Sequence, residues 1–144
     1  MREVQTRYPS FPAVETEQAL AIEPERNWQV LCGDRDHWRA GVYSPAATSA
    51  EQIAELEQHD CAELFCLLEG RLTLLVARNR QLEQLVLEPG RPVLVDAPHA
   101  GFCPDGPHSG RALVVERDSF DTRYAAPHAF ATNQTLEFEP VGEE

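Results

Sequence analysis

The chain has 144 residues, of which 42% are apolar and 25% are charged, and these proportions are typical of a single globular domain. Its 24 acidic and 12 basic residues give a net charge of −12, which argues against nucleic acid and anionic membranes as partners. Every basic residue is an arginine, so a Schiff-base lysine, a pyridoxal phosphate enzyme and a P-loop are excluded. No stretch approaches the ~20 apolar residues of a membrane span. The first residues lack the apolar run of a signal peptide, and we therefore expect a cytoplasmic protein.

The four cysteines predict free thiols. Cys32, Cys61, Cys66 and Cys103 form no C-x-x-C pair, and their spacing matches no zinc ribbon. Without a secretory signal, we expect all four to be reduced. Cys66 is interpreted as a small buried hydrophobe, and Cys61 as a residue that could border an interior pocket.

The order of predicted elements indicates an all-β chain. Residues 1–27 contain three prolines and predict an extended arm. The capping-box pattern at 48–51 predicts a short helix over 49–57. Short strands with turn residues between them then follow closely, which is typical of a β-sandwich or barrel. We expect the barrel to span 28–140 and the tail at 141–144 to be disordered. The predicted strands cover residues 28–32, 37–44, 61–70, 71–78, 82–88, 92–97 and 111–117, with a further one at 135–140.

Side-chain alternation along 61–70 predicts two apolar faces. If Glu63 points inward, four neighbours of the same parity do so too, namely His59, Cys61, Phe65 and Leu67. The opposite face carries Leu64, Cys66 and Leu68. A solvated face would not be this apolar, so the arm or a second copy should cover it. We therefore expect a homodimer.

The segment at 57–70, EQHDCAELFCLLEG, resembles the first motif of the cupin family, H-x-H-x(3,4)-E-x(6)-G. His59 stands at the second histidine of the motif, Glu63 at the glutamate and Gly70 at the glycine. Glu57 replaces the first histidine, and it faces the site only if it does not belong to the end of the preceding helix. The resemblance covers residues 38–118. It implies a double-stranded β-helix, the jelly-roll barrel of cupins, with one short helix before the first motif.

The second cupin motif is poorly kept and leaves two alignments open. In the first, Gly90 opens the motif and VLVDAPHAG places His99 at its histidine. The distance from His99 to the strand at 111–117 suits the family. The rival alignment uses PDGPH and places His108 there, although it lies farther from Gly90 than the motif allows. We prefer His99.

The resemblance implies a metal site inside the barrel. His59, Glu63 and His99 would form a set of two histidines and one carboxylate, which suits iron, manganese, nickel or zinc and leaves open positions for a substrate. Glu57, if inward, would add a second carboxylate and favour a harder ion. Glu57 or His108 would then move protons.

Two classes of function follow from this reading. In the first, the chain binds a divalent metal and a small organic ligand, and acts as a dioxygenase, an isomerase or epimerase, or a lyase. In the second, it is a metal-free ligand-binding or regulatory cupin without catalysis, as the missing first histidine suggests. Because this barrel hosts many chemistries, the fold alone does not decide between them.

Overall fold

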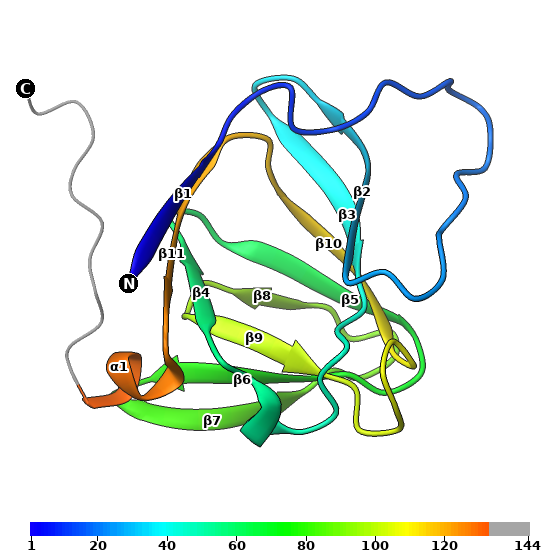
Figure 1. Ribbon diagram of the computed structural model, residues 1–144. Coiled ribbons are helices and arrows are strands. Elements are labelled where there is room, and N and C mark those ends of the chain that lie inside the picture. Colours follow the sequence, from blue (N-terminus) through cyan, green and yellow to red (C-terminus); the bar gives the residue numbers. More distant parts are fainter. Residues whose placement is uncertain (133–144) are drawn as a thin grey trace, which may run out of the picture.

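The structure is a computed structural model that describes residues 1–132, so the strand expected at 135–140 and the tail at 141–144 lie outside the described residues. Two antiparallel sheets face each other and close into a barrel (Figure 1). The six-stranded sheet has the order β1 (Arg2–Thr6), β11 (Phe120–Ala125), β4 (Leu56–His59), β9 (His99–Phe102), β6 (Thr73–Arg78) and β7 (Gln81–Val86). The five-stranded sheet has the order β2 (Trp28–Asp34), β3 (Trp38–Tyr43), β10 (Arg111–Arg117), β5 (Glu63–Glu69) and β8 (Val93–Val95). The all-β expectation is confirmed.

The core lies between the inner faces of the two sheets. Alternate residues of β5, β6 and β10 point inward, and Phe65, Leu74 and Val114 are almost fully buried there. A second apolar cluster joins Leu56 of β4 to Phe130 of α1 (Pro127–Thr132), the helix that packs against β6 and β7. Each buried side chain of this size stabilises the fold by roughly 1.5–3 kcal/mol. This packing fixes the strands whose ends carry the polar residues of the interior.

The short helix is one turn of 3-10 helix, Ala50–Gln52, rather than a helix over 49–57. Ser49 makes no capping hydrogen bond through its side chain, and the backbone is already extended at Ile53. Leu56 is drawn into the apolar cluster with Phe130, so the chain enters strand β4 instead of continuing the helix. As a result Glu57 lies on a strand.

The predicted strand at 61–70 begins only at Glu63, because the chain first crosses between the sheets. His59 ends β4 in the six-stranded sheet, and Glu63 starts β5 in the opposite sheet. Asp60 anchors the crossing: its backbone N–H donates to the carbonyl of Asp121 at 3.0 Å, and its side chain accepts from the N–H of Asp121 at 3.0 Å. The residues after 117 continue into β11, which pairs with β4 on one side and β1 on the other.

The first part of the arm adds a strand to the chain's own barrel, since β1 pairs with β11. Farther along, the Ser10 hydroxyl donates to the carbonyl of Asp118 at 2.6 Å. On the outer face of β5, Leu64 and Leu68 are 38% and 46% exposed. The homodimer that would cover them stays a prediction.

All four cysteines are free, which confirms the expectation of unpaired thiols. Cys61 is buried, as its parity predicted. Across residues 1–132, no helix combines the length and the apolar character needed to cross a membrane.

We expect Gly70→Ala to destabilise the protein far more than Gly90→Ala. Both glycines have positive φ angles, 67° and 71°, so each alanine would incur a backbone cost of about 1–2 kcal/mol. At Gly70 an added Cβ would also lie 2.2 Å from the carbonyl oxygen of Ser109, whereas at Gly90 nothing lies within 4 Å. Urea unfolding of both variants measures the difference. Equal losses of stability would contradict the close approach at Gly70.

Candidate metal centre

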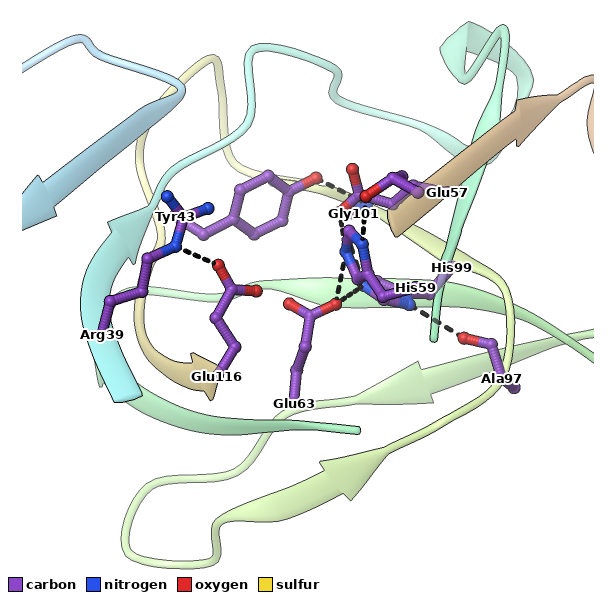
Figure 2. Close-up of polar contacts among 10 residues, drawn as sticks. Arg39, Tyr43, Glu57, His59, Glu63, Ala97, His99, Gly101 and Glu116 are labelled. Carbon is purple, nitrogen blue, oxygen red and sulfur yellow. Dashed lines mark hydrogen bonds and ion pairs between the residues drawn. The ribbon is translucent and has the colours of Figure 1, made fainter. Parts of the chain in front are cut away.

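Four side chains from both sheets converge inside the barrel. Glu57 and His59 lie two residues apart on β4 and therefore share one face of the six-stranded sheet. His99 starts β9 and stands opposite Glu57 in the strand register. Glu63 starts β5 and reaches the cluster from the other sheet. The structure thus brings together the three predicted metal ligands and also Glu57 (Figure 2).

The distances within this cluster are those of ligands around one ion. Oε1 of Glu63 lies 2.6 Å from Nε2 of His59 and 3.2 Å from Nε2 of His99. Oε1 of Glu57 lies 3.4 Å and 3.5 Å from the same two nitrogens. One atom from each of the four residues falls within 4.8 Å of all the others. With metal–ligand bonds of about 2.1 Å, neighbouring ligands stand about 3.0–3.4 Å apart, so a small ion needs only slight adjustment here.

The hydrogen bonds of the two histidines aim their free nitrogens at the cluster. Nδ1 of His99 lies 2.9 Å from the carbonyl oxygen of Ala97, which can only accept, so Nδ1 carries a proton and Nε2 is the nitrogen that faces the cluster. Nδ1 of His59 is held 2.7 Å from the hydroxyl of Thr122. Metal-binding histidines usually make a hydrogen bond through the ring nitrogen that does not bind the metal, because this bond fixes the orientation and tautomer of the ring.

Two buried atoms of the cluster lack a hydrogen-bond partner among the described residues, Oε1 of Glu63 and Nε2 of His99. The two atoms lie 3.2 Å apart, within ion-pair distance, and Oε1 of Glu63 also lies 2.6 Å from Nε2 of His59. A buried polar atom without a partner costs about 1–3 kcal/mol. Lone pairs that converge in this way fit a cation between them, and the residues present therefore suit a divalent metal ion.

In the metal-free cluster, the carboxylate of Glu63 and the two imidazoles shift one another's pKa values, which favours the charged form of each. Burial opposes a charge on His59, but the contacts with Glu57 and Glu63 outweigh it and raise its pKa to about 11. Burial also lowers the pKa of His99, but the charge of Glu63 outweighs this effect, and the pKa of His99 is raised overall. Burial alone would raise the pKa of Glu63, yet the two histidines hold it well below its ordinary value. Without a metal, protons on the imidazoles balance the carboxylates.

A cavity of about 310 Å³ opens beside the cluster. Its walls include the aromatic rings of Trp28, Tyr43, Phe65, Phe120 and Tyr124. Tyr43 is fixed by its hydroxyl, which accepts a hydrogen bond from the N–H of Gly101 at 2.8 Å. The volume lies at the lower end of the range of small-molecule sites. Glu57, His59 and Glu63 also line it, so the cavity admits a small organic molecule next to these three residues of the cluster.

The sequence analysis missed a second polar group in this cavity, an ion pair between Arg39 and Glu116. Nε of Arg39 donates to Oε2 of Glu116 at 2.8 Å, and both side chains are buried. Burial and the charge of Glu63 raise the pKa of Glu116 to about 7, although Arg39 counters both. Strand parity could have revealed this pair from the sequence. Arg39 has the same parity as Gly41 and Tyr43 on β3, and Glu116 has the same parity as Val114 on β10.

The structure does not bring His108 to the cluster. His108 lies in the loop between β9 and β10, where its Nδ1 is 2.6 Å from the carbonyl oxygen of Ser44. It is absent from the residues that line the cavity. Among the described residues, His99 rather than His108 lies in the cluster. Cys61, although buried, does not line the cavity either.

We expect the metal-free protein to lose stability as the pH rises above neutrality. The folded-state pKa of His59, about 11, exceeds its ordinary value of 6.5, so its contribution is fully present below pH 6.5 and fades between 6.5 and 11. The expected slope is about 1.4 kcal/mol per pH unit for His59 alone. The lowered pKa of Glu63 works in the opposite direction, and its contribution is lost as the pH falls below 4.5.

Urea unfolding in the presence of a chelator, repeated across this pH range, measures the effect. His59→Gln should flatten the slope above pH 6.5. An unchanged slope in that variant would contradict the charged state assigned to His59.

Comparison with known proteins adds structural likeness only. No family model matches the sequence, and no curated protein does. Hydroxypropylphosphonic acid epoxidase from S. wedmorenis has a similar structure, with a TM-score of 0.54 and 16% identity over 73% of this chain and 59% of that chain. The structure of Fe(II) HppE gives a TM-score of 0.52 and 16% identity over 72% of this chain and 57% of that chain. A cupin-2 domain containing protein from Shewanella frigidimarina NCIMB 400 gives a TM-score of 0.49 and 14% identity over 67% of this chain and 84% of that chain. The chain thus spans less than two thirds of the length of the epoxidase.

The fold itself is clear from these observations together. Two antiparallel sheets close into a barrel, and Glu57, His59 and Glu63, which resemble a cupin motif, lie inside it, with Gly70 at the turn that follows β5. The chain therefore has a double-sheet β-barrel fold like that of hydroxypropylphosphonic acid epoxidase.

Proposed function

We propose that the barrel binds a divalent metal ion through Glu57, His59, Glu63 and His99, and a small organic ligand in the cavity beside it. The observation that carries the proposal is the convergence of four ligand atoms within 4.8 Å. The unpartnered atoms of Glu63 and His99 support it, because a cation would satisfy both at once. Glu57, whose side chain is 32% exposed, stands at the more open side of the cluster.

The donor set favours iron or manganese among the divalent ions. Two carboxylates balance the charge of the ion, so the loaded centre is neutral and is less costly to keep in a buried site. Carboxylate oxygens suit harder ions such as Mn(II), and imidazole nitrogens suit Fe, Ni and Zn. HppE, which has a similar fold, holds Fe(II) in one structure, and this supports iron here.

A metal bound at this place would supply Lewis acidity or activate oxygen. The chain's own residues would orient the ligand and exclude water, since aromatic rings line the cavity beside Glu57, His59 and Glu63. We propose a metal-dependent enzyme of the dioxygenase, isomerase or epimerase, or lyase classes. The competing function, a metal-free binding or regulatory barrel, is an outcome of the experiment below.

We expect protein purified without a histidine tag to contain close to one equivalent of a divalent metal, measured by plasma mass spectrometry. His59→Ala and His99→Ala should each lower the content at least tenfold, because each removes a ligand that no neighbour replaces. Circular dichroism and urea unfolding would show that the variants are folded.

The matched control is His108→Ala, which removes a histidine outside the cluster and should leave the metal content unchanged. Metal-free wild type, even after reconstitution with Fe(II) or Mn(II), would refute the metal site and leave the ligand-binding barrel. Loss of metal in His108→Ala alone would instead favour the rival alignment.

Glu57→His should keep the metal but change its identity. The substitution restores the histidine of the cupin motif and replaces an oxygen donor by a nitrogen donor, which favours Ni and Zn over Mn. We expect the ratio of bound Zn to bound Mn, after equilibration with both ions, to rise at least tenfold over wild type. Glu57→Ala is the control and should weaken both ions. An unchanged ratio would show that Glu57 is not a ligand.

A further inference from the structure

The ion pair between Arg39 and Glu116 forms a second polar pole in the cavity, separate from the four metal ligands. Both residues line the same cavity as Glu57, His59 and Glu63. Figure 2 shows Arg39 and Glu116 on one side of Glu63 and the two histidines on the other. A ligand beside the cluster therefore meets this pair as well.

The pair has hydrogen-bonding capacity to spare. Arg39 uses Nε for Glu116 and Nη1 for the carbonyl of Ser10, at 2.8 Å each. Among the described residues nothing accepts from Nη2, which stands on the same edge of the guanidinium as Nε. Oε1 of Glu116 has no donor within the described part either, and it points toward Glu63 (Figure 2). A donor and an acceptor thus stand side by side.

The surroundings of Arg39 hold its guanidinium in place. Its central carbon lies 5.1 Å from the ring centre of Phe120 and 5.7 Å from that of Trp28, both of which line the cavity. Stacking of this kind preorients the planar group, so that little entropy is lost when a ligand binds. The backbone of Ser10, in the N-terminal arm, fixes it from a third direction.

Charge decides which ligand group suits this pole. Three carboxylates line the cavity, those of Glu57, Glu63 and Glu116. A divalent ion balances the first two, and Arg39 balances the third, so the lining carries no excess negative charge when the metal is bound. Arginine pairs best with carboxylates, because the hydrogen bond is charged on both sides.

We infer that the ligand is a small carboxylic acid with a hydroxyl group on the carbon next to the carboxylate, the carboxylate contacting Nη2 of Arg39 and the hydroxyl donating to Oε1 of Glu116. This inference rests on the proposed function. A hydroxyl oxygen keeps lone pairs for the metal while it donates to Glu116. The corresponding amide keeps this hydroxyl but lacks the negative charge that pairs with Arg39, so the hydroxy acid is favoured over its amide.

Isothermal titration calorimetry on the metal-loaded protein tests this with two matched pairs of probes, lactate against propionate and malate against succinate. Each pair differs by one hydroxyl group. We expect the hydroxy acid to bind about tenfold or more tightly, since hydrogen bonds to charged groups are worth that much. Lactamide should bind more weakly than lactate.

Two variants separate the roles of the pair. Glu116→Gln frees Arg39 from its counter-charge, so propionate should bind more tightly than to wild type while the preference for lactate falls to about threefold or less. The double variant R39Q/E116Q leaves a neutral pair able to hydrogen-bond, which protects the fold, and should weaken lactate at least tenfold. The control is R78Q/E83Q, which removes an exposed arginine–glutamate pair outside this cavity and should change nothing.

Metal content, measured on each variant, distinguishes the two proposals. Metal-loaded protein that binds none of the probes, or binds lactate equally well in wild type and R39Q/E116Q, would overturn the ligand class and leave the metal site intact. Metal-free wild type that still binds lactate through Arg39 would overturn the metal site and support the ligand class.

Discussion

The barrel must keep the buried carboxylate of Glu63 next to the imidazoles of His59 and His99. Glu63 is 97% enclosed, and an isolated carboxylate at such a depth would be strongly disfavoured. Two imidazoles approach it from the opposite sheet, and either protons on these rings or a metal ion must supply the balancing charge. The barrel therefore has to hold β4 and β9 of one sheet and β5 of the other so close that His59, His99 and Glu63 are in contact.

The crossing between His59 and Glu63 meets this requirement. Three residues carry the chain from one sheet to the other, and the hydrogen bonds between Asp60 and Asp121 hold that crossing against β11. The tight turn after β5, where Gly70 lies against Ser109, fixes the far end of the same strand. Apolar packing of Phe65 and Val114 keeps the strand in register, so its first residue, Glu63, stays in the cluster.

The cavity joins two electrostatic systems that the sequence separates widely. Glu57, His59, Glu63 and His99 form one of them, and Arg39 with Glu116 forms the other. Burial, together with the nearby charge of Glu63, raises the pKa of Glu116 to about 7 despite its arginine partner. A bound metal and a bound ligand would each change the charge that the other experiences, so the two sites are linked through the same carboxylates.

The all-β class, the shared parity of Glu63 and Phe65, and the spacing that marks His59 could be predicted from the sequence, because a strand's alternation and a short motif are local properties. The sequence could not settle whether Glu57 belonged to a helix or a strand, since the burial of Leu56 against the distant Phe130 overrides the local capping pattern. His99, and not His108, reaches the cluster because β9 pairs with β4, a contact between segments 42 positions apart. The pairing of Arg39 with Glu116 likewise arises only when β3 and β10 lie side by side. Tertiary structure decided these points because long-range strand pairing, which local sequence does not encode, determines which side chains meet.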